Sequence, residues 1–319
     1  MKNLICIIAG EPNSINSELI GKIWKKKKLF KKSKIFIVGN YKIIKKQFEK
    51  IKINIKIKKI SNIEKEDFKD LSILDIPLNF NDPFNVATKN KRDYLIKSFN
   101  VAIHLAKNKK IRGFINCPIN KLDTFGNKTI GVTEFLAKKE KVLGKEVMLI
   151  YNNKLSVSPI TTHIQVKKIS KSLSKKLIID KFLKIDKFYK KIFNMKPNIG
   201  LLGLNPHNYE LRGNSEEKKI IIPAIRRVKK LKIKVNGPLS GDTAFTNFKN
   251  KKFNILVGMY HDQVLSPFKT MFKFDAINIT LGLKYTRVSP DHGIAKEIIG
   301  KNKANYLSLL NCISFLKRF

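Results

Sequence analysis

Acidic residues are scarce in this chain, and so is arginine. Of its 319 residues only 24 are Asp or Glu, whereas 66 are Lys or Arg, so the formal net charge is +42. Taken alone, such an excess predicts a polyanionic partner. Only seven of the cations are arginines, however, and arginine carries much of the specific recognition of bases and phosphates. The scarcity of arginine argues against a protein that binds nucleic acid specifically.

The lysine excess has a simpler explanation in coding bias. Lysines are spread over most of the predicted surface, with a modest excess before residue 60, and the rest of the composition leans to Ile, Asn and Phe. All four residue types can be written with A/T-rich codons, as in a reduced bacterial genome. A true RNA- or DNA-binding role is the alternative. Either way the surface repels itself, and nonspecific RNA is expected to co-purify at low salt.

Paired cysteines and long apolar runs are also missing. The three cysteines are widely spaced and contain no CxxC pair, which argues against a disulfide framework and favours a reducing compartment. No run reaches the roughly 18 apolar residues that a membrane span needs. The start, MKNLICIIAGEP, lacks a small-residue cleavage site and predicts a first strand, not a signal peptide. We expect a cytoplasmic protein without a membrane segment.

The glycine-rich fingerprint GxGxxG does not occur among the 16 glycines. The common dinucleotide-binding loop is therefore excluded. Its absence does not exclude NAD itself, because other loops can bind a dinucleotide.

Short apolar runs alternate with amphipathic stretches along most of the chain. The runs predict strands and the stretches predict helices. This alternation favours an α/β fold with mostly parallel strands, and the length suits two domains. The expected strands are 4–9, 33–38, a half-exposed 51–60, 113–116, 198–203 and 253–259, with a hairpin from 141–151 and 155–160; the expected helices are 17–25, 91–108 and 218–231, and the lysine-rich tracts 25–32 and 167–187 are expected to be basic helices.

The segment 258–293 concentrates polar residues between apolar runs that predict strands. It holds a His-Asp pair, a lysine, an amide, an arginine and an Asp-His-Gly sequence. Imidazole is a ligand of divalent cations, and guanidinium and ammonium groups hold carboxylate or phosphate. The set as a whole indicates a site for a metal and an anionic substrate. A buried strand pair with solvated charges is the alternative for any single residue.

Four of the five histidines follow a turn or the end of an apolar strand. Three neutral imidazoles around one divalent ion form a known catalytic arrangement with an open position for substrate. His163, His207 and His261 are candidates, but their separations along the sequence do not show that they converge. His104 lies inside a helical pattern, where packing is the expected role.

Seven sequence blocks in order resemble the 4-hydroxythreonine-4-phosphate dehydrogenase family, relatives of isocitrate and isopropylmalate dehydrogenases. The resemblance runs nearly end to end and implies two α/β/α domains flanking a cleft, with the last segment returning to the first domain. We expect a first domain of residues 1–130 plus 291–319 and a second of 131–290. The blocks are GEP at 10–12, NCPINK at 116–121, GVTEFLA at 131–137, TTH at 161–163, LGLNPH at 202–207, GPLSGDTAF at 237–245 and the segment 258–293.

The resemblance also implies the chemistry of the site. The implied reaction is the NAD- or NADP-dependent oxidation and decarboxylation of 4-phosphooxy-L-threonine to 3-amino-2-oxopropyl phosphate in pyridoxal phosphate biosynthesis. One divalent metal, Zn, Mg or Co, is implied at each site of a homodimer whose sites lie at the subunit interface. The implied residues are His163, His207 and His261 for the metal, Thr133, Lys269, Asn278 and Arg287 for the substrate, and Asp291, His292 and Gly293 for the cofactor.

Two carboxylates, Asp242 and Asp262, are candidates for orienting an imidazole, although either can simply cap a helix. The general base is not identified by the sequence.

Three positions depart from the family pattern. Val132 stands where the family usually has a histidine; Ser14, Asn16 and Ser17 replace two glycines and a proline of the first loop; and NYELRG replaces a glycine-rich stretch after His207. Lost glycines restrict conformations with positive φ, and a lost imidazole donor weakens anion binding by about 1–3 kcal/mol. We expect weaker substrate or cofactor binding. Two alternatives stay open: the same chemistry on another phosphorylated hydroxy acid, such as a phosphoerythronate-type substrate, or a decayed enzyme that binds polyanions.

Overall fold

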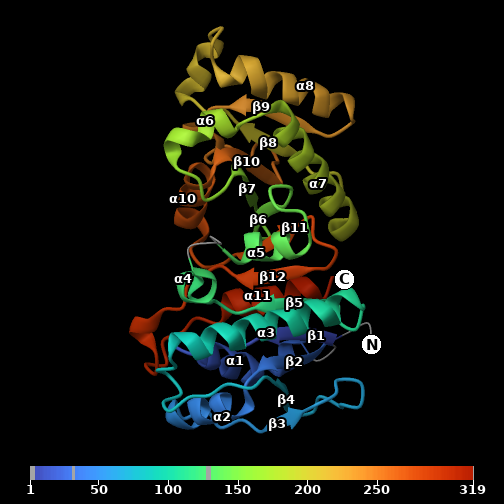
Figure 1. Cartoon of the computed structure of the whole chain (residues 1–319). Coiled ribbons are helices and arrows are strands. Elements are labelled where there is room, and N and C mark those ends of the chain that lie inside the picture. Colours follow the sequence, from blue (N-terminus) through green and yellow to red (C-terminus); the bar gives the residue numbers. More distant parts are fainter. Residues whose placement is uncertain (1–3, 31–32, 127–130, 319) are drawn as a thin grey trace. The chain divides into compact units, whose positions relative to one another are not determined.

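The structure is a computed structural model that describes residues 4–30, 33–126 and 131–318. Its chain divides into two compact units: unit 1 is Met1–Phe135 with Lys284–Phe319, and unit 2 is Leu136–Leu283. The sequence placed the crossings near residue 130, which lies outside the described residues, and near residue 290. Each unit combines a sheet with helices, so the expected α/β class is confirmed (Figure 1).

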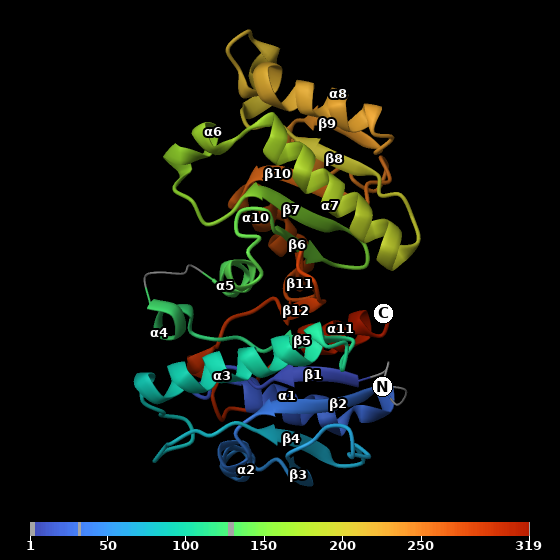
Figure 2. The same ribbon diagram turned by 45° about the vertical axis from the view of Figure 1, so that its right-hand side comes forward.

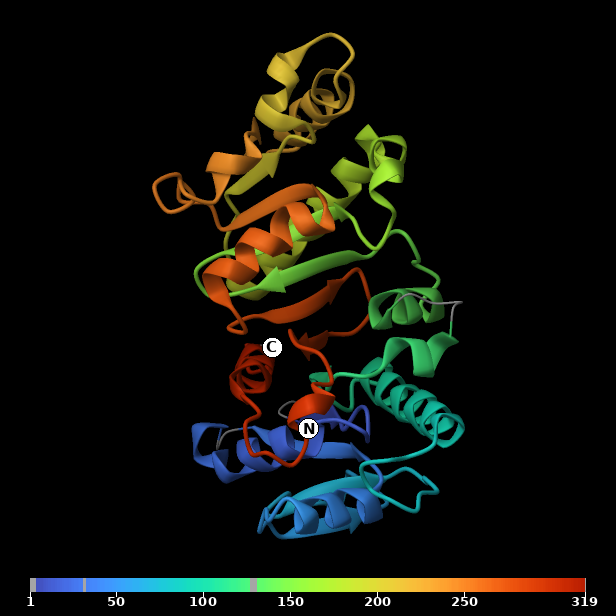
Figure 3. The same cartoon turned by 90° about the vertical axis from the view of Figure 1, so that its left-hand side faces the viewer.

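Unit 1 is built on parallel strands in the order β3-β4-β2-β1-β5-β12, which Figure 2 shows one beside the next. Strands β1, β2 and β5 are almost wholly buried, as expected where helices cover both faces of a parallel sheet. Helix α3 lies on one face, and α1 and α11 lie on the other (Figure 3). The elements of unit 1 are β1 (Leu4–Ile8), α1 (Asn16–Lys25), η1 (Lys27–Phe30), β2 (Lys34–Gly39), α2 (Tyr41–Lys50), β3 (Ile57–Ile60), β4 (Leu71–Asp75), α3 (Thr88–Lys107), β5 (Gly113–Asn116), α4 (Lys121–Phe125), the start of α5 (Val132–Lys139), β12 (Arg287–Pro290), η6 (Lys296–Ile298) and α11 (Leu307–Leu316).

Unit 2 has the strand order β11-β6-β7-β10-β8-β9. Strand β6 is antiparallel to both of its neighbours, and β7, β10, β8 and β9 are parallel. The expected hairpin is confirmed, with Ile150 of β6 opposite Val157 of β7. The views place α10 on one face and α7 with α8 on the other (Figures 1 and 3). The elements of unit 2 are β6 (Val147–Tyr151), β7 (Ser156–Thr161), η3 (Val166–Lys168), α6 (Ile169–Ser172), α7 (Lys175–Phe193), β8 (Ile199–Leu202), η4 (Pro206–Leu211), the π-helical turn η5 (Glu217–Ile221), α8 (Ile222–Lys230), β9 (Val235–Leu239), α9 (Gly241–Ala244), β10 (Ile255–Tyr260), α10 (His261–Phe272) and β11 (Ile277–Leu281).

Two sequence predictions differ from the structure. The apolar run after His261 was expected to be a strand but forms α10, because Val264, Leu265 and Phe268 share one buried helical face. Of the expected strand 51–60 only Ile57–Ile60 is one, and Lys52, with φ of +55°, ends the preceding helical turn.

None of the helices in the described ranges is both long and apolar enough to cross a membrane.

A substitution at Gly113, the first residue of β5, tests how closely β5 packs against the segment at the start of β12. An added Cβ would lie 2.6 Å from the backbone oxygen of Thr286, which also accepts the Phe114 amide. We expect Gly113→Ala to lower the free energy of unfolding by about 1–3 kcal/mol, measured by urea denaturation. Gly213→Ala is the control, since nothing lies within 4 Å of its added Cβ. Equal effects of the two substitutions would contradict the packing argument.

Candidate functional site

The predicted metal ligands lie at one edge of the unit 2 sheet. Strands β7, β10 and β8 are parallel neighbours, so their carboxyl ends share an edge, which is where α/β folds place ligands. His163 follows β7 by two residues, His261 directly follows β10, and His207 lies in the turn after β8.

The structure brings two of the three imidazoles together. The ring centroids of His163 and His261 are 5.6 Å apart. Nδ1 of His261 lies 2.7 Å from Oδ1 of Asp262, and such a carboxylate contact orients an imidazole so that its other nitrogen faces a ligand. Within the described ranges, no group of three or more His, Cys, Asp or Glu side chains is arranged to hold a metal.

Asp242 belongs to the same edge. It lies in the first turn of α9, which follows β9, the neighbour of β8. The Ser240 side chain and the nearby His207 hold the pKa of the Asp242 carboxyl below its usual range. Asp242 therefore stays ionised close to His207.

Two expected substrate residues also belong to unit 2. Lys269 lies on α10, two turns after His261. Asn278 lies on β11 opposite Ile150, and its Oδ1 is buried without a hydrogen-bond partner in the described part of the chain. A buried amide oxygen of this kind is usually satisfied by a ligand or a water, so the Asn278 position suits a binding role.

Three further motifs meet at the carboxyl edge of unit 1. GEP follows β1, NCPINK follows β5 and Asp-His-Gly follows β12, and these strands are neighbours in the order β1-β5-β12. The loop after β1 contacts the segment after β12 through the Ile15 amide and the Ile294 carbonyl, 3.3 Å apart. The sheet therefore gathers three sequence-distant motifs.

Arg287, the rarest type of cation in the chain, is buried in unit 1. Its Nε donates to Oδ1 of Asn116 at 2.6 Å, and only 3% of the residue is exposed. Burial lowers its pKa to about 10, so it remains a cation at neutral pH. Thr133, the other expected substrate residue of this unit, is the second residue of α5 and is half-buried.

The expected cofactor residues lie in the turn after β12. The Asp291 amide donates to Oγ of Ser308 on α11 at 2.9 Å. Nδ1 of His292 lies 2.9 Å from the carbonyl of Gly293. A Cβ added to Gly293 would meet nothing within 4 Å, so this turn has open space beside its backbone.

Side-chain hydrogen bonds hold the glycine-poor first loop closed. Gly10, with φ of +76°, is its residue with positive φ, and a Cβ there would lie 2.6 Å from Nδ2 of Asn16. Oγ of Ser14 donates to the Glu11 carbonyl at 2.5 Å and accepts the Asn16 amide at 3.1 Å. Nδ2 of Asn16 donates to the Pro118 carbonyl at 2.8 Å. The side chains of Ser14 and Asn16 thus hold the loop by hydrogen bonds to its backbone and to the Pro118 carbonyl.

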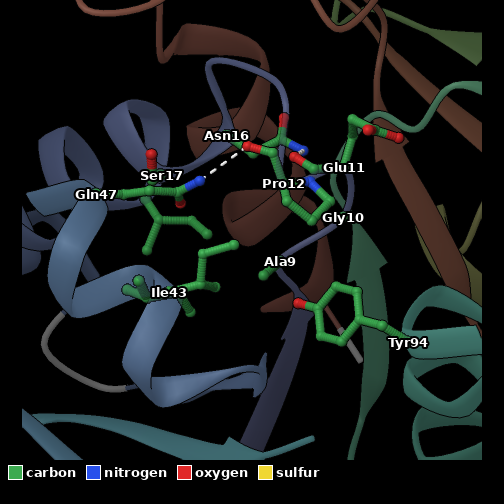
Figure 4. A pocket seen from close by; sticks show the side chains of 11 residues that line it. Ala9, Gly10, Glu11, Pro12, Asn16, Ser17, Ile43, Gln47 and Tyr94 are labelled. Carbon is green, nitrogen blue, oxygen red and sulfur yellow. Dashed lines mark hydrogen bonds between the residues drawn. The ribbon is translucent and has the colours of Figure 1, made fainter. Parts of the chain in front are cut away.

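A small cavity lies between this loop, α2 and Tyr94 (Figure 4). Its volume of about 10 Å³ is enough for one water. Gln47 closes one side by donating to the Pro12 and Pro83 carbonyls at 2.8 and 2.6 Å. Oδ1 of Asn16 and Oγ of Ser17 are buried without partners in the described part of the chain. The cavity suits a structural water and is too small for a substrate.

The sequence did not reveal a buried ion cluster beside the same loop. Nζ of Lys91 lies 2.9 Å from Oε1 of Glu11 and 2.9 Å from Oδ2 of Asp123. The side chains of Lys91 and Glu11 are 3% and 0% exposed. One signal was present: Lys91 lies on the buried helical face of α3 with Tyr94 and Leu95, where a lysine needs a partner.

The loop that carries His207 keeps a glycine-like backbone without glycine. His207, Asn208 and Leu211 have φ of +48°, +55° and +56°. Non-glycine residues in this region are strained by about 1–2 kcal/mol. This loop therefore stores strain at three non-glycine positions, whereas the first loop has its positive φ at Gly10.

Comparisons with known proteins agree with the motifs. A family model described as "Pyridoxal phosphate biosynthetic protein PdxA" matches residues 31–316. The 4-hydroxythreonine-4-phosphate dehydrogenase of Sulfurihydrogenibium sp. (strain YO3AOP1) is 35% identical over 97% of this chain and 96% of its own. An Oceanobacillus iheyensis protein named "Putative D-threonate 4-phosphate dehydrogenase" is 30% identical over 98% of this chain and 96% of its own. The crystal structure of a 4-hydroxythreonine-4-phosphate dehydrogenase from Burkholderia phymatum has a TM-score of 0.82 at 27% identity, covering 100% of this chain and 98% of that one.

Lys91→Met tests the buried ion cluster. The substitution leaves the Glu11 carboxylate buried without its cation, so we expect a loss of about 3–5 kcal/mol in the free energy of unfolding. The double variant Lys91→Met/Glu11→Gln is expected to lose less than the single one, measured by urea denaturation. A double variant that loses the sum of both single effects would show that the two side chains are not coupled.

Leu211→Gly tests the strain in the His207 loop. Leu211 is 44% exposed and has positive φ, so glycine relieves strain while losing little packing. Glycine also costs conformational entropy on folding, so the net expected gain in the free energy of unfolding, measured by urea denaturation, is up to about 1 kcal/mol. Leu231→Gly is the matched control, because Leu231 is 39% exposed but has φ of −84°. Destabilisation by both substitutions would argue that the loop is unstrained.

Proposed function

This chain belongs to the PdxA family of pyridoxal phosphate biosynthetic proteins, and we propose that it oxidises and decarboxylates 4-phosphooxy-L-threonine to 3-amino-2-oxopropyl phosphate with NAD. Membership makes it an oxidoreductase of the 4-hydroxythreonine-4-phosphate dehydrogenase type. The observation that carries the reaction proposal is the arrangement of His163, His261 and His207 at the ends of three adjacent parallel strands.

Three imidazoles are chemically suitable ligands for a divalent cation, and two of them already lie close together. His163 and His261 lie ring to ring, and Asp262 orients the second. The cation, Zn, Mg or Co, would supply Lewis-acid polarisation of the substrate hydroxyl. His163, His207 and His261 would hold it, and Asp242 would keep His207 in a negative environment.

A second copy of the chain offers a way to complete the ligand set. A single chain brings two imidazoles together in its described part, and no group of three. We propose a homodimer in which the metal site is completed between two chains. Such a site would depend on protein concentration as well as on metal.

Four residues are proposed to bind the substrate's anionic groups. Arg287 and Lys269 supply positive charge, Thr133 supplies a hydroxyl at the start of α5, and Asn278 supplies an amide whose oxygen is buried without a protein partner in the described ranges. Asn116 holds the guanidinium of Arg287 in place. The proposed role of these residues is to orient the substrate.

The turn at Asp291, His292 and Gly293 is proposed to bind a nicotinamide dinucleotide, NAD or NADP, which would supply the hydride acceptor. Ser308 fixes the Asp291 backbone, and Gly293 leaves room beside the turn. The first loop, held by hydrogen bonds of Ser14 and Asn16, contacts the segment after this turn through the Ile15 amide and the Ile294 carbonyl.

A second substrate class is favoured by two observations. The Oceanobacillus relative carries the name of a D-threonate 4-phosphate dehydrogenase, and Val132 stands where a histidine donor is expected. We therefore keep the same chemistry on another phosphorylated hydroxy acid, including phosphoerythronate-type substrates, as the alternative.

The proposed reaction is tested by following NADH formation with 4-phosphooxy-L-threonine, NAD and added divalent metal. We expect reduction of NAD that requires metal, and a fall in kcat/KM of more than about 100-fold in His261→Ala. His104→Ala is the matched control: His104 is an exposed helix residue whose ring contacts Asn108, so its loss is expected to leave turnover unchanged.

Undiminished turnover after treatment with EDTA would rule out the metal role. Reduction of NAD with D-threonate 4-phosphate and none with 4-phosphooxy-L-threonine would move the assignment to the alternative substrate class.

A further inference from the structure

Side chains outside the predicted ligand set tie together the strand ends that carry the three histidines. The links join β7 to β10, and β10 to β8, at their carboxyl ends. They come from Thr161 and Gln263, and Glu217 of η5 adds a third link to the loop after β8; none of the three is a candidate metal ligand.

The first link joins the His163 and His261 strands. Thr161, the last residue of β7, donates from Oγ1 to the Met259 carbonyl at 2.7 Å, and this bond is buried. Thr161 is two residues before His163, and Met259 is two residues before His261. The hydroxyl therefore fixes the separation of the two backbones two residues before His163 and His261.

The second link joins the His261 and His207 strands. Oε1 of Gln263 accepts the Met259 amide at 2.6 Å, and its Nε2 donates to the Gly203 carbonyl at 2.7 Å. The side chain starts in the first turn of α10 and bridges the ends of β10 and β8. A Cβ on Gly258 would lie 2.8 Å from Oε1 of Gln263, so this glycine leaves room for the bridge.

The third link joins Glu217 of η5 to the backbone of the loop that carries His207. Glu217 is 0% exposed, and its Oε1 accepts the amides of Leu204 and Asn205 at 2.7 and 2.9 Å. Its Oε2 accepts Nδ2 of Asn205 at 3.0 Å. Although burial opposes ionisation, these N–H groups hold the pKa of Glu217 below its usual range. In a chain so rich in lysine, this buried carboxylate takes backbone and amide donors from the loop just before His207.

We propose that Thr161, Gln263 and Glu217 are positioning residues that fix the loops carrying His163, His261 and His207, and that the positions of these loops determine how tightly the metal site, completed between two chains, binds its cation. The claim about cation affinity rests on the proposed function. The claim that the three side chains hold the loops in place, here called the bracing, does not. Gln263 gives the cleanest test, because it is uncharged and its loss changes no long-range electrostatic attraction for a cation.

The chain offers a matched control at the opposite edge of the same two strands. Nδ2 of Asn198, just before β8, donates to the Lys251 and Lys252 carbonyls, just before β10, at 2.9 and 3.0 Å. Asn198→Leu therefore removes an amide bridge between the same strands at their amino ends, as Gln263→Met does at their carboxyl ends. A merely structural role predicts similar consequences for both.

The experiment uses the full chain with Co²⁺ as the probe. Visible absorption gives the Co²⁺ dissociation constant, and hydrogen exchange of the metal-free protein reports on residues 203–208. We expect Gln263→Met and Thr161→Val to weaken Co²⁺ binding by about 10-fold or more, with faster exchange of residues 203–208 in Gln263→Met. Asn198→Leu and the hydroxyl-retaining Thr161→Ser are expected to stay within about twofold of the unaltered chain.

The outcomes separate the two proposals. Unchanged exchange and unchanged affinity in Gln263→Met, or equal losses in Gln263→Met and Asn198→Leu, would overturn the bracing. If the unaltered chain binds no Co²⁺ while Gln263→Met still loosens residues 203–208, the bracing stands and the metal proposal fails. If the unaltered chain binds Co²⁺ and Gln263→Met binds it equally tightly with unchanged exchange, the metal proposal stands and the positioning role fails.

Discussion

Parallel pairing of strands is the constraint on which the candidate chemistry of both units depends. Neighbouring parallel strands end at the same edge, so residues far apart in sequence meet there without any direct attraction between them. In unit 2 this places His163, His261 and His207 in the segments that follow neighbouring strands, and in unit 1 it gathers the loops after β1, β5 and β12. Buried apolar strands make the pairing stable, which leaves the loops free to carry polar residues.

The first loop and the His207 loop hold their backbones in different ways. In the first loop, Ser14 and Asn16 hydrogen-bond to backbone atoms, and beyond Gly10 no positive φ is needed. In the His207 loop, three non-glycine residues keep positive φ and Glu217 supports the backbone just before them. The second solution stores strain next to a proposed ligand, where a bound cation can offset it.

The lysine excess leaves the interior little changed. Among the buried carboxylates, Glu217 takes N–H donors, whereas Glu11, Glu18, Glu66 and Asp186 each pair with one lysine, and of these lysines only Lys91 is itself buried. Other ion pairs, such as Lys50–Asp82, Lys56–Asp70 and Lys69–Asp67, involve exposed lysines, and such pairs contribute little to stability. The high charge is thus a property of the solvated surface, consistent with coding bias and without need of a polyanion-binding site.

The sequence by itself determined the α/β class, most strands, the hairpin between β6 and β7 and the family, because apolar periodicity and ordered motifs are local properties. It also marked His163, His207 and His261 as strand-end residues. Only the tertiary structure decided that the run after His261 is a helix, since burial of Val264 and Phe268 on one face depends on what packs against them. The roles of Lys91 and Gln263 could not be predicted from the sequence either. One is a lysine among dozens and the other a glutamine near a histidine, and each acts through partners more than 30 residues away. Those partners are brought close by strand pairing, a long-range contact that no local pattern encodes.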